Sequence, residues 1–218
     1  TREQWGFSKW LGHVPALWKK VHAEAEERAA AGMAKPPLWI RGYEADPRLI
    51  QPARNNIERA GMSDWRPMRV ADIPSVAAIS DAVHGDYTEQ AAVYANRLQL
   101  HPRGCWLLER DGKAIGYLIS HPWEGTQPPA LNQLIEKLPE PADHYYLHDL
   151  ALLPDARGTG AAQVAIVIVQ DQAEKIGARR IALTAVNGAD AFWGRNGFTA
   201  MAAGGTYGGD SLAMERFL

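Results

Sequence analysis

Two ionisable residues, His148 and Asp149, stand next to each other in an otherwise apolar stretch that runs from Tyr145 to Leu152. An imidazole or a carboxylate in such a strand can act as a general base. Strand alternation predicts that the two side chains point to opposite faces of a sheet, so that only one faces a given cleft. Burial would raise the pKa of Asp149. The structural alternatives are an aspartate that holds a loop and a histidine satisfied within the core.

A glycine-rich turn follows this strand and leads into an apolar helix. Pro154 ends the strand. The apolar run Val164 to Val169 belongs to the helix that follows the turn, and we expect this helix to have at least four turns. A helix that starts on such a turn directs unpaired N–H groups outward, at its positive end. The sequence therefore predicts a pyrophosphate site formed by the backbone of Arg157, Gly158, Thr159, Gly160, Ala161 and Ala162.

A second block begins at Ala185 and includes the pair Gly197-Phe198. Together the two blocks resemble the GCN5-related N-acetyltransferase (GNAT) family, whose acetyl-CoA motif Arg/Gln-x-x-Gly-x-Gly/Ala is matched by Arg157, Gly160 and Ala162. The resemblance implies acetyl-CoA as the cofactor and transfer of its acetyl group to an amine of a small molecule or a protein. We expect the pantetheine amides to pair, like an added strand, with the main chain of Leu150, Ala151 and Leu152.

The resemblance also implies roles for single residues. Acetyltransferases often carry an acid in the strand before the turn, which makes Asp149 our first choice as the base and His148 the second. The family often has a tyrosine as the acid where this chain has Trp193, and indole cannot donate a proton at neutral pH. Tyr207, in a glycine-rich loop, is a candidate replacement, and surface packing is its alternative. By resemblance, Asn187 and Phe192 contact the cofactor.

The acceptor side is less defined. In the family, two helices frame it, which correspond here to residues 73–83 and 88–100. Four residues could bind a cationic or aromatic acceptor: Tyr87, His121, Trp123 and Glu124. Each of them is equally consistent with an ordinary loop residue that has no part in binding. His121, Trp123 and Glu124 stand at the start of an insertion that extends to about residue 138, with a short helix expected near 131–138. Its length suits a lid or substrate wall, and an ordinary surface loop is the alternative.

The remaining elements predict an α/β fold with a mixed, partly parallel central sheet flanked by helices. Residues 105–109 and 113–120 form a hairpin around Arg110-Asp111-Gly112. Further strands are expected at 179–185, 198–202 and 211–217, and a helix at 188–195. We place a domain boundary at residues 62–67, so that residues 66–218 form the GNAT domain.

The first 65 residues have a different character and contain five of the eight tryptophans. They predict an amphipathic helix near 13–31, a strand at 38–44 and a helix from Asp46 to Ala60. This segment resembles an internal piece of the large bacterial 23S rRNA guanine-N2 methyltransferases, which use S-adenosylmethionine and a Rossmann-like fold; Glu44 or Asp46 would stand at the ribose position. The family's glycine loop and Asn-Pro-Pro-Tyr motif do not occur. We therefore expect a fragment retained for packing or association, with no complete active site.

Composition limits which partners and which cellular compartment are to be expected. The 218 residues are 46% hydrophobic and 22% charged, and a net charge of −2 gives no reason to expect a nucleic-acid partner. The one cysteine, Cys105, cannot form an internal disulfide, which suggests the bacterial cytoplasm. No membrane segment, signal peptide or metal site is expected, and a homodimer is left open. Because the chain begins with Thr1, we expect a processed product or a piece of a longer reading frame.

Two other functions remain open. Trp193 in place of the usual tyrosine would suit a domain that binds acyl-CoA without turnover, as a sensor or an assembly module. The methyltransferase-like segment would suit an acetyltransferase that is recruited to ribosomal RNA.

Overall fold

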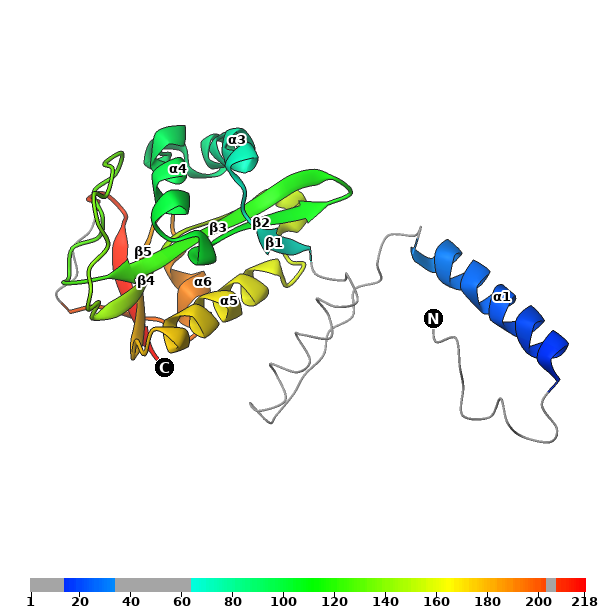
Figure 1. Ribbon diagram of the computed structural model, residues 1–218. Coiled ribbons are helices and arrows are strands. Elements are labelled where there is room, and N and C mark those ends of the chain that lie inside the picture. Colours follow the sequence, from blue (N-terminus) through cyan, green and yellow to red (C-terminus); the bar gives the residue numbers. More distant parts are fainter. Residues whose placement is uncertain (1–13, 34–63, 203–206) are drawn as a thin grey trace. The chain divides into compact units, whose positions relative to one another are not determined.

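The chain divides into two compact units, residues 1–62 and 63–218. The computed structural model describes residues 14–33, 64–202 and 207–218 (Figure 1). In the first unit it describes helix α1 (Pro15–Met33), on which Leu17 and Val21 are exposed. The expected strand at 38–44 and helix at 46–60, with Glu44 and Asp46, lie outside the described residues.

The second unit is built on a seven-stranded sheet in the order β1-β2-β3-β4-β5-β7-β6. Only β4 and β5 pair in parallel, and the other neighbours are antiparallel, so the expected mixed, partly parallel sheet is confirmed. The strands are β1 (Trp65–Pro67), β2 (Cys105–Arg110), β3 (Lys113–Trp123), β4 (His144–Leu152), β5 (Arg180–Ala185), β6 (Thr199–Ala200) and β7 (Leu212–Phe217).

Helices cover both faces of this sheet. Figure 1 shows α3 (Ile73–His84) and α4 (Ala91–Leu100) on one face, and α5 (Ala161–Lys175) and α6 (Asp190–Arg195) on the other. Pro74 stands in the first turn of α3, where its missing N–H costs nothing. No described helix is both long and apolar enough to cross a bilayer.

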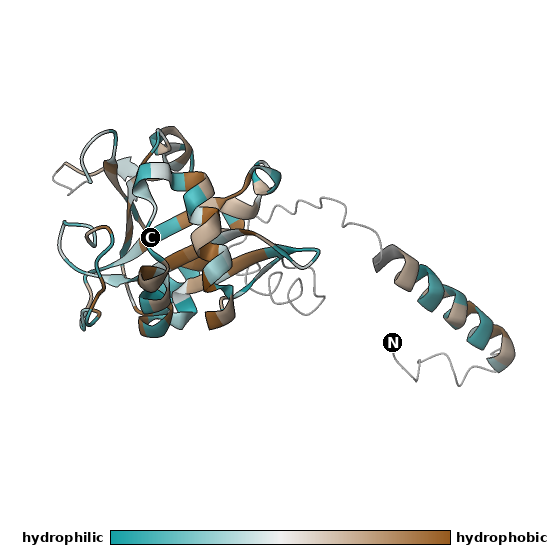
Figure 2. Ribbon diagram, turned by 90° about the horizontal axis from the view of Figure 1, so that it is seen from above, coloured by the Kyte–Doolittle hydropathy of each residue, from teal (hydrophilic) through white to brown (hydrophobic). Residues whose placement is uncertain are grey.

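Each face of the sheet has its own hydrophobic core. The core under α5 includes Tyr145, Leu147 and Trp193, whereas the core under α3 and α4 includes Tyr94, Tyr117 and Ala151. In Figure 2 the most hydrophobic residues gather in the central strands and in the helices packed against them. β4 contributes to both cores, so its two faces are set by packing on either side.

The segment between β3 and β4 is an irregular loop, and the expected helix at 131–138 is wrong. Its backbone polar groups bond to α4 instead. The carbonyl oxygen of Gln133 accepts from Arg97 Nη2 at 2.9 Å, and the N–H and C=O of Ile135 bond to the side-chain amide of Asn96, both at 3.0 Å. Side chains of α4 therefore replace the bonds that a helix would have made within itself.

Candidate functional site

β4 separates from β5 halfway along its length. The two strands pair only from Tyr145 to Leu147, opposite Ile181 to Leu183. Beyond Leu147, β4 keeps its antiparallel partner β3 on one side and has no strand on the other. The main chain of residues 148–152 thus presents an edge to which an extended group could add. One acceptor on β4 is already taken, because Arg157 Nε donates to the carbonyl oxygen of Leu152 at 3.1 Å.

The glycine turn lies directly beyond this edge. Gly158 and Gly160 have φ values of 71° and 87°, a left-handed conformation that glycine adopts without strain, and Gly160 is the N-cap of α5. Thr159 Oγ1 accepts a long 3.4 Å bond from the Ala161 N–H. The N–H groups of Gly160, Ala162 and Gln163 have no hydrogen-bond partner among the described residues. The start of α5 therefore retains the donors that an anion site requires.

A buried tryptophan fixes the first turn of α5. Trp65 on β1 donates from Nε1 to the carbonyl oxygen of Ala161 at 3.1 Å. The position of the turn is thus set by the far edge of the sheet as well as by its own glycines.

A β-bulge stands where β4 leaves β5. Ile119 pairs with Asp149 and Ser120 pairs with Leu147, so His148 is an extra residue with no partner on β3. Bulges break the regular alternation of side chains and re-aim them, and they are frequent next to active sites.

The bulge turns His148 and Asp149 to the same face. Leu147 and Leu150 both pack in the core under α5, so the two residues between them face the side of α3 and α4. Their contacts agree, since both bond to residues at the end of α3 or just before α4. The prediction that alternation sends them to opposite faces is wrong, because it assumed an unbroken strand.

Asp149 is held by two side chains. His84 Nε2, at the end of α3, lies 2.7 Å from Asp149 Oδ1, and Tyr117 on β3 donates to Oδ2 at 2.5 Å. Burial alone would raise the pKa of Asp149, but the charge of His84 and these hydrogen bonds outweigh it and lower that pKa. Asp149 in turn raises the pKa of His84. The expected upward shift for Asp149 is wrong, because the sequence did not reveal its partners.

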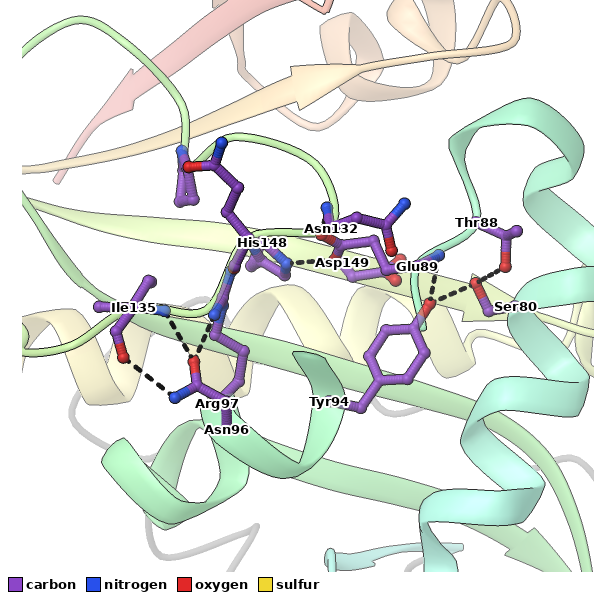
Figure 3. Close-up of polar contacts among 12 residues, drawn as sticks. Ser80, Thr88, Glu89, Tyr94, Asn96, Arg97, Asn132, Ile135, His148 and Asp149 are labelled. Atoms are coloured by element: carbon purple, nitrogen blue, oxygen red, sulfur yellow. Dashed lines mark hydrogen bonds and ion pairs between the residues drawn. The ribbon is translucent and has the colours of Figure 1, made fainter. Parts of the chain in front are cut away.

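His148 forms a second carboxylate–imidazole pair (Figure 3). Its Nε2 lies 2.8 Å from Glu89 Oε2, and the two side chains are 2% and 4% exposed. The other ring nitrogen, Nδ1, is itself buried and has no hydrogen-bond partner among the described residues. A carboxylate on Nε2 favours the tautomer with hydrogen there, which leaves a lone pair on Nδ1. His148 therefore has an unoccupied basic atom, whereas both oxygens of Asp149 are engaged.

The candidate acid Tyr207 is occupied, and Trp193 at the position of the family's tyrosine is part of the core. Tyr207 donates its hydroxyl proton to the carbonyl oxygen of Pro129 at 3.0 Å, and burial together with Tyr146 raises its pKa. Trp193 is buried and packs edge-on against Phe192 and Phe198. Neither side chain is arranged to deliver a proton.

The four predicted acceptor residues do not converge. His121 is buried, with rings of Trp123 and His148 beside it, and burial lowers its pKa. Trp123 donates from Nε1 to the carbonyl oxygen of Gln127, and Glu124 is exposed.

Tyr87 instead lines an open pocket of about 540 Å³ that also includes His84 and Asn187. Three aspartates also line this pocket: Asp81, Asp86 and Asp210. Asp210 accepts a hydrogen bond from the Tyr87 hydroxyl at 2.8 Å. Asn187 donates from Nδ2 to the carbonyl oxygen of His84 at 3.3 Å. The pocket is therefore acidic and reaches the Asp149 pair through His84.

Three residues of this arrangement were missed from the sequence: Glu89, His84 and Tyr117. Each approaches β4 from another element, and none stands in a recognisable motif. His84 closes the apolar pattern of α3, and Glu89 precedes that of α4, where acidic residues are common for reasons of helix stability alone.

Comparison with known proteins agrees with the fold. A family model described as the acetyltransferase (GNAT) family matches residues 70–198. The GNAT-like decarboxylase GphF, solved with isobutyryl-CoA, superposes with a TM-score of 0.58 over 70% of this chain and 98% of that one, at 15% identity. The ribosomal-protein-S18-alanine N-acetyltransferase from Escherichia coli gives 0.50 over 70% and 92%, at 17% identity. The chain belongs to the acetyltransferase (GNAT) family.

A different relationship covers a short stretch of the chain. Over 64 residues, 29% of its length, it is 84% identical to the ribosomal RNA large subunit methyltransferase K/L of Ectopseudomonas mendocina (strain ymp). The match spans 9% of that relative, so only a fragment of the methyltransferase is shared. The expected resemblance of the N-terminal segment to a fragment of such a methyltransferase is confirmed.

Proposed function

We propose that the chain is an N-acetyltransferase that moves the acetyl group of acetyl-CoA to an amine of a small molecule or a protein, with His148 as the base. One arrangement carries this proposal. The unpaired edge of β4 runs from the bulge at His148 to the unpaired N–H groups of the glycine turn.

The cofactor would lie along that edge. The N–H groups of Gly160, Ala162 and Gln163 would hold the diphosphate, and the main chain of residues 148–152 would pair with the pantetheine amides. Acetyl-CoA supplies an acyl group activated as a thioester. A backbone N–H at the edge of β4 would polarise the thioester carbonyl, and one such donor is worth about 3–4 kcal/mol in related sites.

His148 would take a proton from the acceptor ammonium at Nδ1. That atom is buried in the free protein, so the side chains around it would have to move when the acceptor binds. The neutral amine then forms the C–N bond as the C–S bond breaks, and its second proton ends on the leaving sulfur. Asp149 is less suited to this task, because its lowered pKa makes it a weak base and both of its oxygens accept hydrogen bonds. We assign no acid, since the Tyr207 hydroxyl is engaged with the carbonyl oxygen of Pro129 and the indole of Trp193 cannot donate a proton at neutral pH.

The acidic pocket beside His84 supports a cationic acceptor. Three aspartates, Asp81, Asp86 and Asp210, surround its opening, and a protonated amine would be attracted there before it loses a proton. The negative charge of the pocket favours a protonated amine over a neutral hydroxyl as the acceptor, and it suits a small molecule and a protein amino terminus equally.

The test is release of free CoA from acetyl-CoA in the presence of a panel of amino acids, diamines and peptides with free amino termini. We expect turnover with at least one amine, and loss of about 100-fold or more in kcat for His148→Gln with unchanged CoA affinity by calorimetry. Wild-type kcat in the His148→Gln variant would overturn the choice of base.

A second candidate is a sensor that binds acyl-CoA without turnover, and the buried Trp193 favours it. CoA binding without release of free CoA from any amine in the panel would support the sensor and contradict the enzyme.

A third candidate is a ribosome-associated acetyltransferase, which rests on the methyltransferase-like fragment. Association with ribosomal RNA that is lost when residues 1–64 are deleted would support it. No association at low salt, where phosphate contacts are strongest, would exclude it.

A further inference from the structure

Glu89 divides its two carboxylate oxygens between two separate parts of the fold. Oε2 faces His148 Nε2 at 2.8 Å, and Oε1 accepts from the backbone N–H of Asn132 at 3.0 Å. The backbone N–H of Glu89 donates to the Tyr94 hydroxyl at 3.1 Å, which itself donates to Ser80 at 2.6 Å. Both the main chain and the side chain of Glu89 are therefore held in place (Figure 3).

The loop that carries Asn132 is docked against the start of α4. Asn132 has a φ of 58°, and its side-chain oxygen accepts from the Gln90 N–H at 2.8 Å. Further along, Arg97 and Asn96 bind the backbone of Gln133 and Ile135. This loop therefore supplies one of the two hydrogen bonds to the Glu89 carboxylate, and it does so through its backbone.

This arrangement constrains the proton on His148. A buried carboxylate that accepts from Nε2 holds the hydrogen there and orients the ring, in the way that second-shell carboxylates fix histidine tautomers in other sites. The lone pair is then on Nδ1, the atom without a partner among the described residues.

We propose that Glu89 is the positioning residue for His148, and that the loop at 129–135 sets the Glu89 carboxylate through the Asn132 N–H. The inference rests on the proposed function, in which His148 is the base. In this proposal the loop between β3 and β4 acts by holding Glu89 in place and does not need to contact the acceptor.

The experiment compares Glu89→Gln, Glu89→Asp and wild type, with Glu136→Gln as the control. Glu136 is exposed on the same loop, and no hydrogen bond or ion pair of its side chain is found among the described residues. We expect Glu89→Gln to lower kcat by about tenfold or more, because an amide can offer either its oxygen or its NH2 group to Nε2 and so no longer holds the hydrogen there. The KM for acetyl-CoA should stay unchanged. Glu89→Asp keeps the charge and should restore part of kcat.

A second readout does not depend on turnover. Nitrogen-15 NMR of the free protein should show His148 with hydrogen on Nε2 in wild type and in Glu136→Gln, and a mixture of tautomers in Glu89→Gln. If wild type turns over and Glu89→Gln leaves both kcat and the tautomer of His148 unchanged, the positioning role is wrong. If no amine is acetylated, the proposed function fails, and the tautomer measurement still decides whether Glu89 orients His148.

Discussion

Replacing Asp149 by asparagine separates a structural role from a catalytic one. The substitution removes a charge that accepts two hydrogen bonds, from His84 at 2.7 Å and from Tyr117 at 2.5 Å. Breaking a fully buried ion pair costs about 3–5 kcal/mol. The side chains of His84 and Asp149 are 14% and 11% exposed, which places the expected loss at the lower end, about 3 kcal/mol. For a domain of this size that corresponds to a fall in Tm of about 6–12 °C.

The loss should depend on pH. Because the pKa of Asp149 is lowered on folding, its contribution is complete above the unfolded carboxyl value of about 4 and disappears as the pH falls through the folded value. Because the pKa of His84 is raised, its contribution is complete below the unfolded imidazole value of about 6.5 and disappears as the pH rises through the folded value. Both contributions are present between about pH 4 and 6.5.

Calorimetric unfolding of wild type and Asp149→Asn should therefore differ more at about pH 5.5 than at about pH 9. His84→Gln should lose a similar amount, and the double variant little more than either single one, since they share one interaction. At a temperature well below unfolding, Asp149→Asn should retain most of its kcat. A variant with wild-type stability and no activity would show instead that Asp149 is the base.

Three further changes test other parts of the structure. Gly160→Val places a branched side chain at φ 87°, beside the unpaired N–H groups, and should weaken CoA binding by about tenfold in calorimetry; unchanged affinity would contradict the diphosphate site. Gly104→Ala would put its Cβ 1.9 Å from the carbonyl oxygen of Ser120, and should lower the free energy of unfolding by about 1–3 kcal/mol in denaturant titrations. Burial raises the pKa of the Cys105 thiol to about 12, so an aromatic disulfide reagent at about pH 8 should modify Cys105 only after unfolding, and rapid reaction of the folded protein would contradict that burial.

The elements that could be predicted from the sequence are those set by local pattern. The strand, turn and helix between His144 and Lys175 follow from an apolar run, a proline and two glycines that are close together in the chain. The unpaired N–H groups then follow from the geometry of any helix start. The type and order of these elements follow from local sequence, whereas the exact position of the turn also depends on the distant Trp65.

The helix expected at 131–138 shows where local pattern fails. Leu131, Leu134, Ile135 and Leu138 have helical spacing, yet Leu134 is 60% exposed and the backbone bonds to Asn96 and Arg97. Those bonds reach back more than thirty residues along the chain. A periodic pattern indicates a helix only if the segment satisfies its own backbone groups, and here α4 supplies the partners.

The bulge is the other feature that a single strand cannot reveal, because register is a property of two strands. One extra residue in β4 turns His148 and Asp149 to the same face, and each then meets a partner of the opposite kind: a carboxylate for the histidine and a histidine for the carboxylate. The two pairs differ in whether they leave a polar atom of the β4 side chain free of hydrogen bonds. The Asp149 pair uses both carboxylate oxygens, whereas the His148 pair leaves Nδ1 without a partner among the described residues. The difference lies in the partners, since Asp149 meets both His84 and Tyr117 whereas His148 meets Glu89 through one ring nitrogen. The family resemblance favours Asp149 as the base, and the hydrogen bonds that engage both of its oxygens are the reason why we propose His148 in its place.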